Sequence, residues 1–522
     1  MTFQTDPLTD PATIQRVVNE RTETERERWQ SERSPEVESS QNFTSEEILN
    51  ALDSNEDGDS FLFVKLHRGR LVYDHAAARW HKWAGHYWQE DFLSEALAGI
   101  EKVIDLYGKE AKRQAWNRVK CEKSGQKDEA EKHAKLEIEL LKRIRGLQSK
   151  SRKEDVLFLA RTGAASLGIT GEEWDRDPMV LVCKNCVIDL RTGEHRAGRP
   201  EDYNKTIAPV EWKWLNEPAQ AWERFLIEIF SGDTELISYI HRVFGYSITG
   251  RTIEHILVIL WGRGRNGKGT FLEMLAFTLG GYAGQVEAEL ILKQRFLKPS
   301  GGPTSDIMTL RGKRLVWASE TDEGRKLNAG KLKWLTGGDT LTGREIYGRR
   351  QVSFSPSHKL FLLTNHKPHG APDDYALWQR IYLIPFTKSF VTDPKEPNEL
   401  RVDPRLPDKL RVEASGILAW LVRGCLAWQR EGLNPPATIK AATEEYRQEE
   451  DTIRLFIEER CRIEPDVEVK AGVLYHAFKA WAEENGIKTI TGTSFGKKFK
   501  ERFKWHQNYK GVFYEGIALT EL

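Results

Sequence analysis

The sequence has few cysteines and no long hydrophobic run, and each shortage excludes a class of protein. Five cysteines in 522 residues are too few for a disulfide framework, which favours the reducing cytosol over secretion. Apolar runs such as ILVILW at 256–261 fall far short of the roughly 18 residues that a membrane-spanning helix needs. The first residues, MTFQTDPLTD, have neither the basic nor the apolar region of a secretory signal. We therefore expect a cytoplasmic protein without a membrane partner.

The sequence also has no net charge, because 78 Lys and Arg balance 78 Asp and Glu. Overall charge therefore gives no indication of a nucleic-acid partner, and any basic surface must be local. Hydrophobic residues make up 39% and charged residues 30%, which suits a globular chain and excludes wholesale disorder. At about 150 residues per domain, the length predicts three or four domains.

The amino-terminal half divides into a polar arm and a folded region. Residues 1–55 are charge-rich with almost no apolar periodicity, which predicts a flexible arm and leaves open one short helix within it. The segments FLFVKL, RLVYD and RWHKWAGHYWQED then alternate like a small β-meander. Residues 91–165 are typical of helices whose charges mostly face water, 180–198 of a hairpin, and 218–248 of helices again. We expect a mixed α+β domain over 56–215.

Two patterns resemble metal sites but lack ligands. Residues 53–59, DSNEDGD, match the first half of a calcium loop, but Val64 stands where the loop needs a glutamate. We interpret this segment as a solvated turn. Cys183 and Cys186 form a lone CxxC, whereas a structural zinc site needs four ligands. We expect a hairpin turn with two buried thiols there.

A glycine-rich loop between a strand and a helix is the most informative segment. EHILVILW at 254–261 has strand character, GRGRNGKGT follows at 262–270, and FLEMLAFTLGG continues as an apolar helix. This is the frame of a GxxxxGK phosphate-binding loop, in which backbone N–H groups and the helix amino terminus converge on phosphate oxygens. Lys268 then supplies a positive charge to the β and γ phosphates. We predict ATP contacts at Gly262, Gly264, Asn266, Gly267, Lys268, Gly269 and Thr270.

The loop departs from the usual motif at one position. Gly269 stands where the motif has the serine or threonine that holds Mg²⁺. Two alternatives remain open: Thr270 takes this role through an altered turn, or water does.

Two further strands end in polar residues that suit a nucleotide site. RLVWASETDE at 314–323 ends in acids, and a carboxylate beside a phosphate-binding loop can hold Mg²⁺ or polarise the attacking water. Glu320 is the first choice, with Asp322 and Glu323 as further candidates; the alternative is a surface strand with an acidic end. HKLFLLTN ends in Asn365, whose amide can sense the γ phosphate or orient water.

Arg380 stands just before a fourth apolar strand, in the segment DDYALWQRIYLIPF. Such an arginine can reach the γ phosphate of a neighbouring subunit as an arginine finger, whereas a lone arginine is more often part of a surface ion pair. Asn365 lies 97 residues after Lys268, and Arg380 follows 15 residues later. The predicted nucleotide core is therefore very compact.

The order and spacing of these elements resemble the superfamily 3 helicases, a branch of the AAA+ ATPases found in viruses, phages and plasmids. The phage/plasmid primase-helicase family, which is related to the poxvirus primase-helicase, has segments similar to GRGRNGKGTF, ASETDEGRKLN, KWLTGGDTLTGREIYGRR, HKLFLLTNHKP and ALWQRIYLIPF. RWHKWAGHYW, VCKNCVIDLRTG and the C-terminal segment extend the resemblance over about 60–520. It implies that Lys268 binds phosphates, Glu320 is the acidic-strand residue, Asn365 is the sensor and Arg380 is the finger.

The fold class that we expect is α/β. The resemblance implies an AAA+ P-loop core of the superfamily 3 type over 216–430, preceded by the α+β region and followed by a winged-helix domain over 435–522. It also implies hexamers and 3′→5′ movement. The family usually carries a primase domain upstream, for which this chain has no room, so we expect no priming activity here and a separate primase or polymerase as a partner.

Two local basic segments are candidates for DNA contact. Thr340–Arg344 and Gln351–Phe354 are predicted to pair as a hairpin, and in superfamily 3 such a hairpin holds one DNA strand in the channel of a ring. The alternative is an ordinary exposed β-turn. The residues predicted to contact single-stranded DNA are Arg344, Tyr347, Arg349 and Arg350.

The second basic segment lies near the carboxyl terminus. AGVLYHAFKAWAEENG and SFGKKFKERF have helical spacing, and a hairpin follows with Lys510 and Gly511 at its turn, as in a winged helix. Residues 470–510 hold nine Lys and Arg and three Glu, a net charge of +6. The alternative is a merely solvated lysine face. The residues predicted to contact duplex or forked DNA are Lys497, Lys498, Lys500 and Arg502.

These features predict an ATP-dependent ring helicase that replicates a phage, plasmid or integrated mobile element in the cytoplasm of a bacterial host. A nucleotide-switched origin-binding or loading protein without processive unwinding is the alternative, which Gly269 keeps open. A primase-helicase that still primes is a third, weaker hypothesis.

Overall fold

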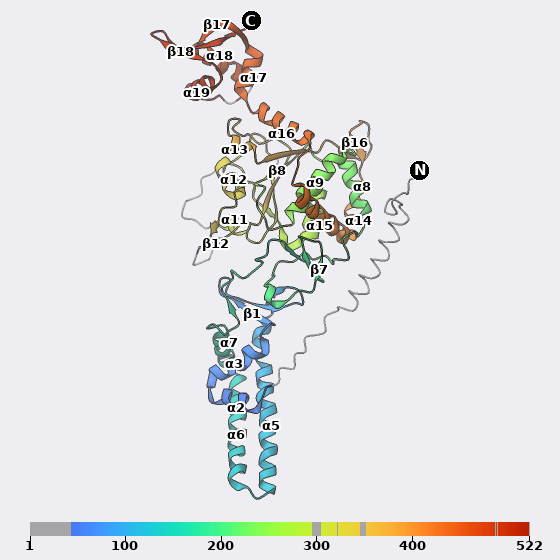
Figure 1. Cartoon of the computed structure of the whole chain (residues 1–522), viewed down its shortest axis with the longest axis vertical. Helices are drawn as coiled ribbons and strands as arrows, with labels where there is room; N and C mark the ends of the chain where they lie inside the picture. The colour runs from blue at the N-terminus through green and yellow to red at the C-terminus, as the bar shows by residue number, and fades with distance from the viewer. Residues whose placement is uncertain are drawn as a thin grey trace, which may run out of the picture. The chain divides into compact units, whose positions relative to one another are not determined.

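The computed structural model describes residues 43–294, 304–320, 322–344, 351–485, 487 and 489–520 (Figure 1). The described chain forms two compact units. One unit runs to Trp174 and includes Arg199–Tyr203, and the other comprises Asp175–Gly198 and everything from Asn204 onward. None of the helices in the described ranges is both long enough and apolar enough to cross a membrane.

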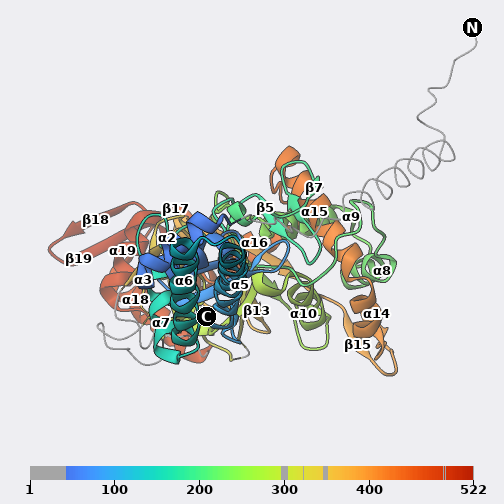
Figure 2. The same cartoon turned by 90° about the horizontal axis from the view of Figure 1, so that it is seen from below.

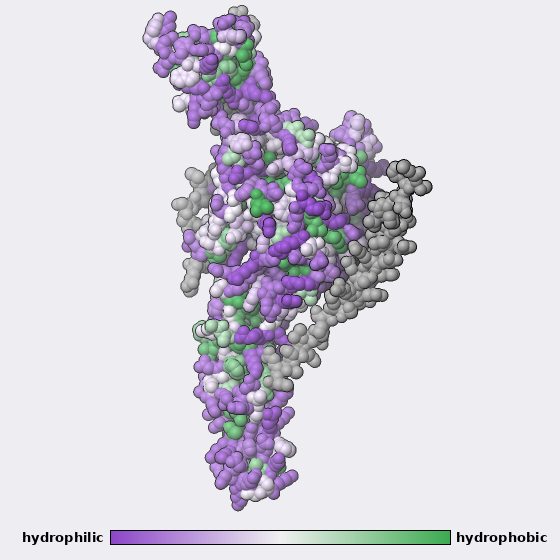
Figure 3. Space-filling view, in the orientation of Figure 1, coloured by the Kyte–Doolittle hydropathy of each residue, from purple (hydrophilic) through white to green (hydrophobic). Residues whose placement is uncertain are grey.

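The amino-terminal unit is built mainly from helices. Phe63, Tyr107 and Leu140 are fully buried in its core, in α3, α5 and α6 respectively. Figure 2 looks along the axes of the paired helices α5 and α6, and Figure 3 shows that the displayed face of this hairpin is mostly hydrophilic. The prediction of helices with water-facing charges over 91–165 is confirmed. The helices are α2 (Ser45–Asp53), α3 (Asn55–His67), α4 (Glu95–Ala98), α5 (Glu101–Lys123), α6 (Lys127–Leu147) and α7 (Lys150–Ala160).

A small sheet completes this unit, with strand order β3-β2-β1-β4. The first three strands are antiparallel neighbours, which confirms a meander for RLVYD and the tryptophan-rich segment. Trp88 and Trp174 lie in its small apolar core, and Trp174 Nε1 donates to Asp74 at 2.7 Å. The strands are β1 (Leu71–Asp74), β2 (Arg79–Trp83), β3 (Trp88–Glu90) and β4 (Gly168–Ile169).

The one short helix left open for the arm over 1–55 is α2, where Thr44 and Glu47 form a capping box and Ile48 faces the core. A strand prediction for this unit is wrong. FLFVKL is part of α3 and not a strand. A short apolar run is compatible with either a helix or a strand, and here packing against other helices buries the neighbouring residues Leu62 and Phe63 together.

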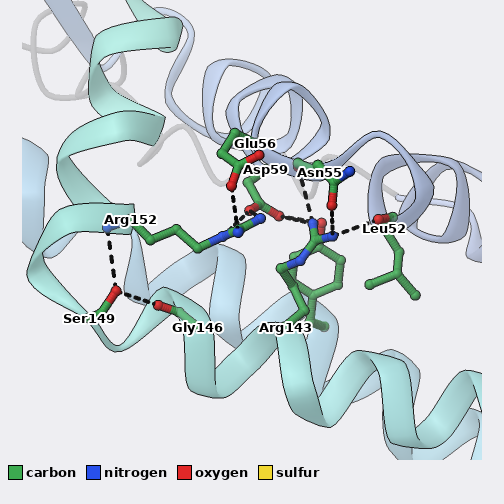
Figure 4. A network of polar contacts seen from close by, with 9 residues as sticks. Leu52, Asn55, Glu56, Asp59, Arg143, Gly146, Ser149 and Arg152 are labelled. Carbon is green, nitrogen blue, oxygen red and sulfur yellow. Dashed lines mark hydrogen bonds and ion pairs between the residues drawn. The ribbon is translucent and has the colours of Figure 1, made fainter.

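The interpretation of DSNEDGD as a solvated turn is also wrong, because most of it lies in α3 and Asp59 is fully buried. Its carboxylate accepts hydrogen bonds from Arg143 of α6 at 2.8 Å and from Arg152 of α7 at 2.8 and 3.0 Å (Figure 4). Glu56 also accepts from Arg152, at 2.7 Å. A buried carboxylate is stable only with such partners, so this network joins α3 to α6 and α7.

The second unit begins with a small antiparallel sheet and two helices. Cys183 and Cys186 lie between β5 and β6, both thiols are buried, and Cys183 N donates to Cys186 O at 2.8 Å. This confirms the predicted hairpin turn, and burial holds the pKa of the Cys183 thiol well above its usual range. The elements are β5 (Val180–Val182), β6 (Val187–Asp189), β7 (His195–Arg196), α8 (Gln220–Ile229) and α9 (Thr234–Ser247).

A five-stranded parallel sheet with order β14-β8-β13-β10-β9 forms the centre of this unit. Alternate residues of β8 enter two different apolar clusters. Val258 and Leu260 pack with α9, α10 (Lys268–Leu279) and α15 (Ala414–Glu431), and Ile259 packs with α12 (Ala329–Thr336). Figure 1 likewise shows α9 and α15 on one side of β8 and α12 on the other. Burial on both faces explains why these strands are continuous apolar runs. The strands are β8 (Leu257–Trp261), β9 (Ala283–Val286), β10 (Leu315–Glu320), β13 (Lys359–Thr364) and β14 (Ile381–Pro385).

Helices and a hairpin surround this sheet. The predicted pairing of the segments around 340–344 and 351–354 is confirmed, because β11 and β12 are antiparallel with Leu341 opposite Phe354. The surrounding elements are α10 (Lys268–Leu279), α11 (Ser305–Met308), α12 (Ala329–Thr336), β11 (Leu341–Gly343), β12 (Val352–Phe354), α13 (Tyr375–Trp378), β15 (Ser389–Val391), β16 (Glu399–Arg401), α14 (Leu406–Val412) and α15 (Ala414–Glu431).

The carboxyl-terminal segment has its own apolar cluster, in which Phe478, Phe495 and Phe499 are buried. The predicted helices and hairpin are present, but no sequence pattern predicted β17. This strand has a mostly exposed, polar face, and its register with β19 shifts between Ile463 and Glu468, as expected around a proline. The elements are α16 (Ala437–Glu449), α17 (Thr452–Arg460), β17 (Cys461–Lys470), α18 (Ala471–Glu484), α19 (Gly492–Arg502), β18 (Trp505–Asn508) and β19 (Gly511–Leu519).

Candidate active site

The glycine-rich loop leaves the carboxyl end of β8 and enters α10, as the sequence predicts. Gly267 has φ 87°, and a Cβ there would lie 2.8 Å from Ile229 Cγ2, so both the backbone conformation and the space require glycine. A Cβ at Gly262 would lie 2.3 Å from Phe386 O. The loop is therefore closely packed against α8 and the end of β14, with its backbone N–H groups at the start of a helix.

Lys268 is the first residue of α10, and its side chain is buried. Its Nζ donates to Gly262 O, and it lies 3.5 Å from Asn365 Oδ1. Burial lowers the pKa of Lys268 to about 8, because the ammonium group is partly removed from water. An anion at this position would replace the lost solvation of the ammonium group.

Glu320 and Asn365 reach the same cavity because β8, β13 and β10 are parallel neighbours, so that their carboxyl ends lie side by side. Glu320 ends β10, and Asn365 directly follows β13. The cavity has a volume of about 360 Å³. Its walls are Gly264, Arg265, Asn266, Gly267, Lys268, Gly269, Thr270, Glu273, Ser319, Glu320, Leu363, Thr364 and Asn365.

Glu320 has an ion-pair partner that the sequence did not indicate. Its Oε2 lies 2.9 Å from Arg325 Nη1, and Arg325 Nη2 contacts Glu289 at 3.0 Å. Only 10% of the Arg325 side chain is exposed. Asp322 is exposed, and its backbone N–H donates to Glu320 Oε1 at 2.9 Å, so it positions Glu320 through the main chain and its own carboxylate does not line the cavity.

Arg380 is not brought to this cavity. Its backbone O accepts from Leu257 N at 2.7 Å, which places it at the amino ends of β8 and β14. A five-residue strand spans about 16 Å, so Arg380 lies at the opposite edge of the sheet from Lys268. Its guanidinium donates to Ala376 O at 2.5 Å.

A second cavity of about 670 Å³ adjoins the first, and Arg265, Gly267 and Thr270 line both. Phe225 of α8 and Phe390 of β15 give it an apolar part. The sequence did not predict this cavity, because its walls come from segments as far apart in the chain as Ala221 and Lys409. Its charged walls are Arg224, Glu228, Arg265, Arg401, Asp403 and Lys409.

Models of three families match successive segments of the chain. "D5 N terminal like" matches 61–231, a "Family of unknown function (DUF5906)" matches 260–380, and "Poxvirus D5 protein-like" matches 448–514. Together these matches support a similarity to the D5-type superfamily 3 helicase-primase family. This confirms the resemblance that the phosphate-binding loop and the strand-end residues indicate.

Several relatives of this chain come from viruses. "Putative helicase L207/L206" of Acanthamoeba polyphaga mimivirus is 24% identical over 442 residues, covering 80% of this chain and 45% of that protein. "Putative helicase 022R" of Frog virus 3 is 26% identical, covering 60% and 40%. "Putative primase C962R" of African swine fever virus is 26% identical, covering 45% and 26%. The D5-type chain thus spans less than half the length of these relatives.

A solved structure, "The apo structure of NrS-1 C terminal region (305-718)", is similar over 88% of this chain and 99% of that chain. The identity is 11% and the TM-score 0.45.

The predicted DNA-contact residues of this D5-type chain have different surroundings. Arg344 follows β11, and its backbone N–H donates to Thr304 Oγ1 at 2.9 Å. Tyr347, Arg349 and Arg350 lie outside the described residues.

Of the four cations of α19 that are predicted to contact DNA, two form ion pairs with acids and two are exposed. Lys498 pairs with Asp373 at 3.1 Å, and Arg502 pairs with Asp451 at 2.6 Å. Lys497 and Lys500 are exposed, and Lys500 Nζ lies 3.8 Å from the centroid of the Trp505 ring. Two of the four positive charges are thus already paired with acids.

Proposed function

We propose that the chain is an ATP-dependent DNA helicase or translocase of the superfamily 3 type. The observation that carries this proposal is that Lys268, Glu320 and Asn365 line one cavity at a phosphate-binding loop. Relatives named as helicases support it.

In this proposal the triphosphate lies against the loop and the nucleoside extends into the adjoining cavity, because Gly267 and Thr270 line both. Lys268 binds the β and γ phosphates, and Asn365, which contacts Lys268, senses the γ phosphate. Glu320 accepts the proton of the attacking water or orients that water, and Arg325 and the Asp322 backbone hold its carboxylate in place.

Thr270 and Glu320 are the residues that we propose to hold Mg²⁺, since both supply oxygen atoms to the cavity wall. The ion, when bound with ATP, neutralises charge that develops on the phosphates.

Arg380 acts on the nucleotide of a neighbouring subunit in this proposal. Because it lies at the sheet edge opposite Lys268, one subunit cannot supply both groups to one nucleotide. Repeating this head-to-tail contact closes a ring, and we propose a hexamer.

We propose two DNA contacts. The β11–β12 hairpin would hold single-stranded DNA in the channel of the ring. The carboxyl-terminal segment would act as a winged helix on duplex or forked DNA, with exposed Lys497 and Lys500 at the phosphates. We further propose that the protein replicates a phage, plasmid or integrated element in a bacterial cytoplasm, with a separate primase or polymerase.

The experiment that tests the proposed function compares Lys268→Ala with Lys440→Ala, an exposed lysine of α16 far along the chain from the loop. Lys268→Ala should abolish ATP hydrolysis and strand displacement on a forked duplex, with the circular dichroism spectrum unchanged. Lys440→Ala should retain both activities. Strand displacement by Lys268→Ala at the wild-type rate would refute the proposal.

Gly269 favours a second candidate, a nucleotide-switched origin-binding or loading protein. Without the hydroxyl that usually holds Mg²⁺ at this position, the site can still bind nucleotide through Lys268 but is less suited to fast hydrolysis. DNA-stimulated turnover without a displaced strand in the same assay would favour this candidate. Nucleotide incorporation on a single-stranded template would instead favour the third, a protein that primes.

A further inference from the structure

The first turns of α10 contain a carboxylate near the place where the usual magnesium-binding hydroxyl is missing. A Cβ built at Gly269 would meet one described atom within 4 Å, namely Glu273 Oε1 at 3.8 Å. Glu273 lies four residues after Gly269, one turn along the same helix face. A serine or threonine hydroxyl would lie one bond beyond that Cβ, so the Glu273 carboxylate lies beside the position that the hydroxyl would occupy.

Glu273 also lines the phosphate cavity together with Lys268 and Glu320. Glu320 is already paired with Arg325, whereas Glu273 has no hydrogen-bond or ion-pair partner among the residues that the structure describes. Carboxylate oxygens are the protein ligands that Mg²⁺ prefers in phosphate sites. A lone carboxylate beside a triphosphate would otherwise repel it.

We propose that Glu273 is the residue that replaces the missing hydroxyl and holds the Mg²⁺ of the bound nucleotide, completing the site formed by Thr270 and Glu320. The proposal rests on the proposed function only in that nucleotide binds at Lys268. It implies a specific sign: Glu273 strengthens binding of the nucleotide with Mg²⁺ and weakens binding of the nucleotide without it.

Equilibrium binding of a fluorescent, non-hydrolysable ATP analogue to the full chain tests this sign. We expect Glu273→Gln to lower the Mg²⁺ affinity of the protein–nucleotide complex by about tenfold or more, and to bind the metal-free analogue at least as tightly as wild type. The electron paramagnetic resonance spectrum of bound Mn²⁺ should change with it. Glu235→Gln, an exposed glutamate of α9 outside the cavity, is the matched control and should behave as wild type.

A second variant keeps the test decisive. Gly269→Thr in the Glu273→Gln background should restore Mg²⁺ affinity, since the Cβ meets only one side-chain oxygen at ordinary contact distance. Two results would overturn the proposal for Glu273: an Mg²⁺ affinity of Glu273→Gln equal to that of wild type, or weaker binding of the metal-free analogue by Glu273→Gln. Unchanged analogue binding by Lys268→Ala would instead overturn the proposed function, so the two failures are distinguishable.

Discussion

Lys268 shows how burial prepares a single side chain for an anionic ligand. Burial removes much of its hydration, and the described residues supply it with a backbone oxygen and an amide oxygen in place of a carboxylate. The charged form is therefore less favourable than in water until a phosphate arrives.

Nucleotide affinity should depend on the protonation of Lys268. The pKa of Lys268 is about 8 in the protein without nucleotide, and a bound phosphate raises this pKa. Above pH 8, Lys268 therefore takes up a proton when nucleotide binds. We expect affinity for a non-hydrolysable analogue to be nearly full at about pH 7, to be about half of that at pH 8, and to fall about fivefold more between pH 8 and pH 9. Lys268→Arg should bind with little change over this range, because arginine stays charged. Equal pH dependence in both proteins would contradict the expectation.

Arg325 is a positioning residue, since it touches Glu320 but does not line the cavity. We expect Arg325→Met to lower kcat by about 10- to 100-fold, because Glu320 loses the partner that fixes its carboxylate. KM for ATP should change little, since the phosphate contacts of Lys268 remain. Arg325→Lys should recover part of the kcat loss. A rise in KM with unchanged kcat would show that Arg325 acts on nucleotide binding instead. Steady-state hydrolysis measurements give both constants.

At the scale of elements, α3, α6 and α7 depend on one buried carboxylate. Asp59 has no exposed side-chain surface, whereas the Glu56 side chain of the same network is 44% exposed (Figure 4). Helices with such polar faces need a specific contact to fix their packing.

Asp59→Ala should destabilise the helical part of the amino-terminal unit by about 3–5 kcal/mol, because it leaves two arginines without their shared partner. Glu56→Gln should cost less than about 1 kcal/mol, since that pair is partly exposed. Hydrogen exchange of peptides from α3, α6 and α7 measures both effects. Equal protection in the two variants would contradict the role given to Asp59.

For the whole molecule, the position of Arg380 bears on the proposed assembly. Lys268 lies at the carboxyl ends of the parallel strands and Arg380 at their amino ends. In the proposed ring, a complete site would therefore take Lys268 from one copy of the chain and Arg380 from the next. Neither copy is expected to hydrolyse ATP fast by itself.

Mixing two inactive variants should therefore restore hydrolysis. Lys268→Ala and Arg380→Ala alone should each be inactive. In an equimolar mixture about a quarter of the interfaces combine an intact Lys268 with an intact Arg380, and we expect a similar share of wild-type activity. Recovery should disappear when the double variant replaces either partner. No recovery in mixed assemblies, confirmed as mixed by native mass spectrometry, would contradict a trans role for Arg380.

The sequence by itself determined the strand–loop–helix around Lys268 and the strands that end at Glu320 and Asn365. These features are local, because an apolar run of strand length and glycines before a helix specify their own conformation. The resemblance to the helicase-primase family was readable from the same segments.

Only the tertiary structure decided which distant residues meet. The strand order β14-β8-β13-β10-β9 differs from chain order, so the strand ends that lie beside the phosphate-binding loop and the walls of the second cavity are not readable along the chain. The Arg325 partner of Glu320 depends in the same way on how a loop folds back. FLFVKL became a helix because packing against α5 and α7 buries Leu62 and Phe63 together, and a short apolar run cannot choose its period alone.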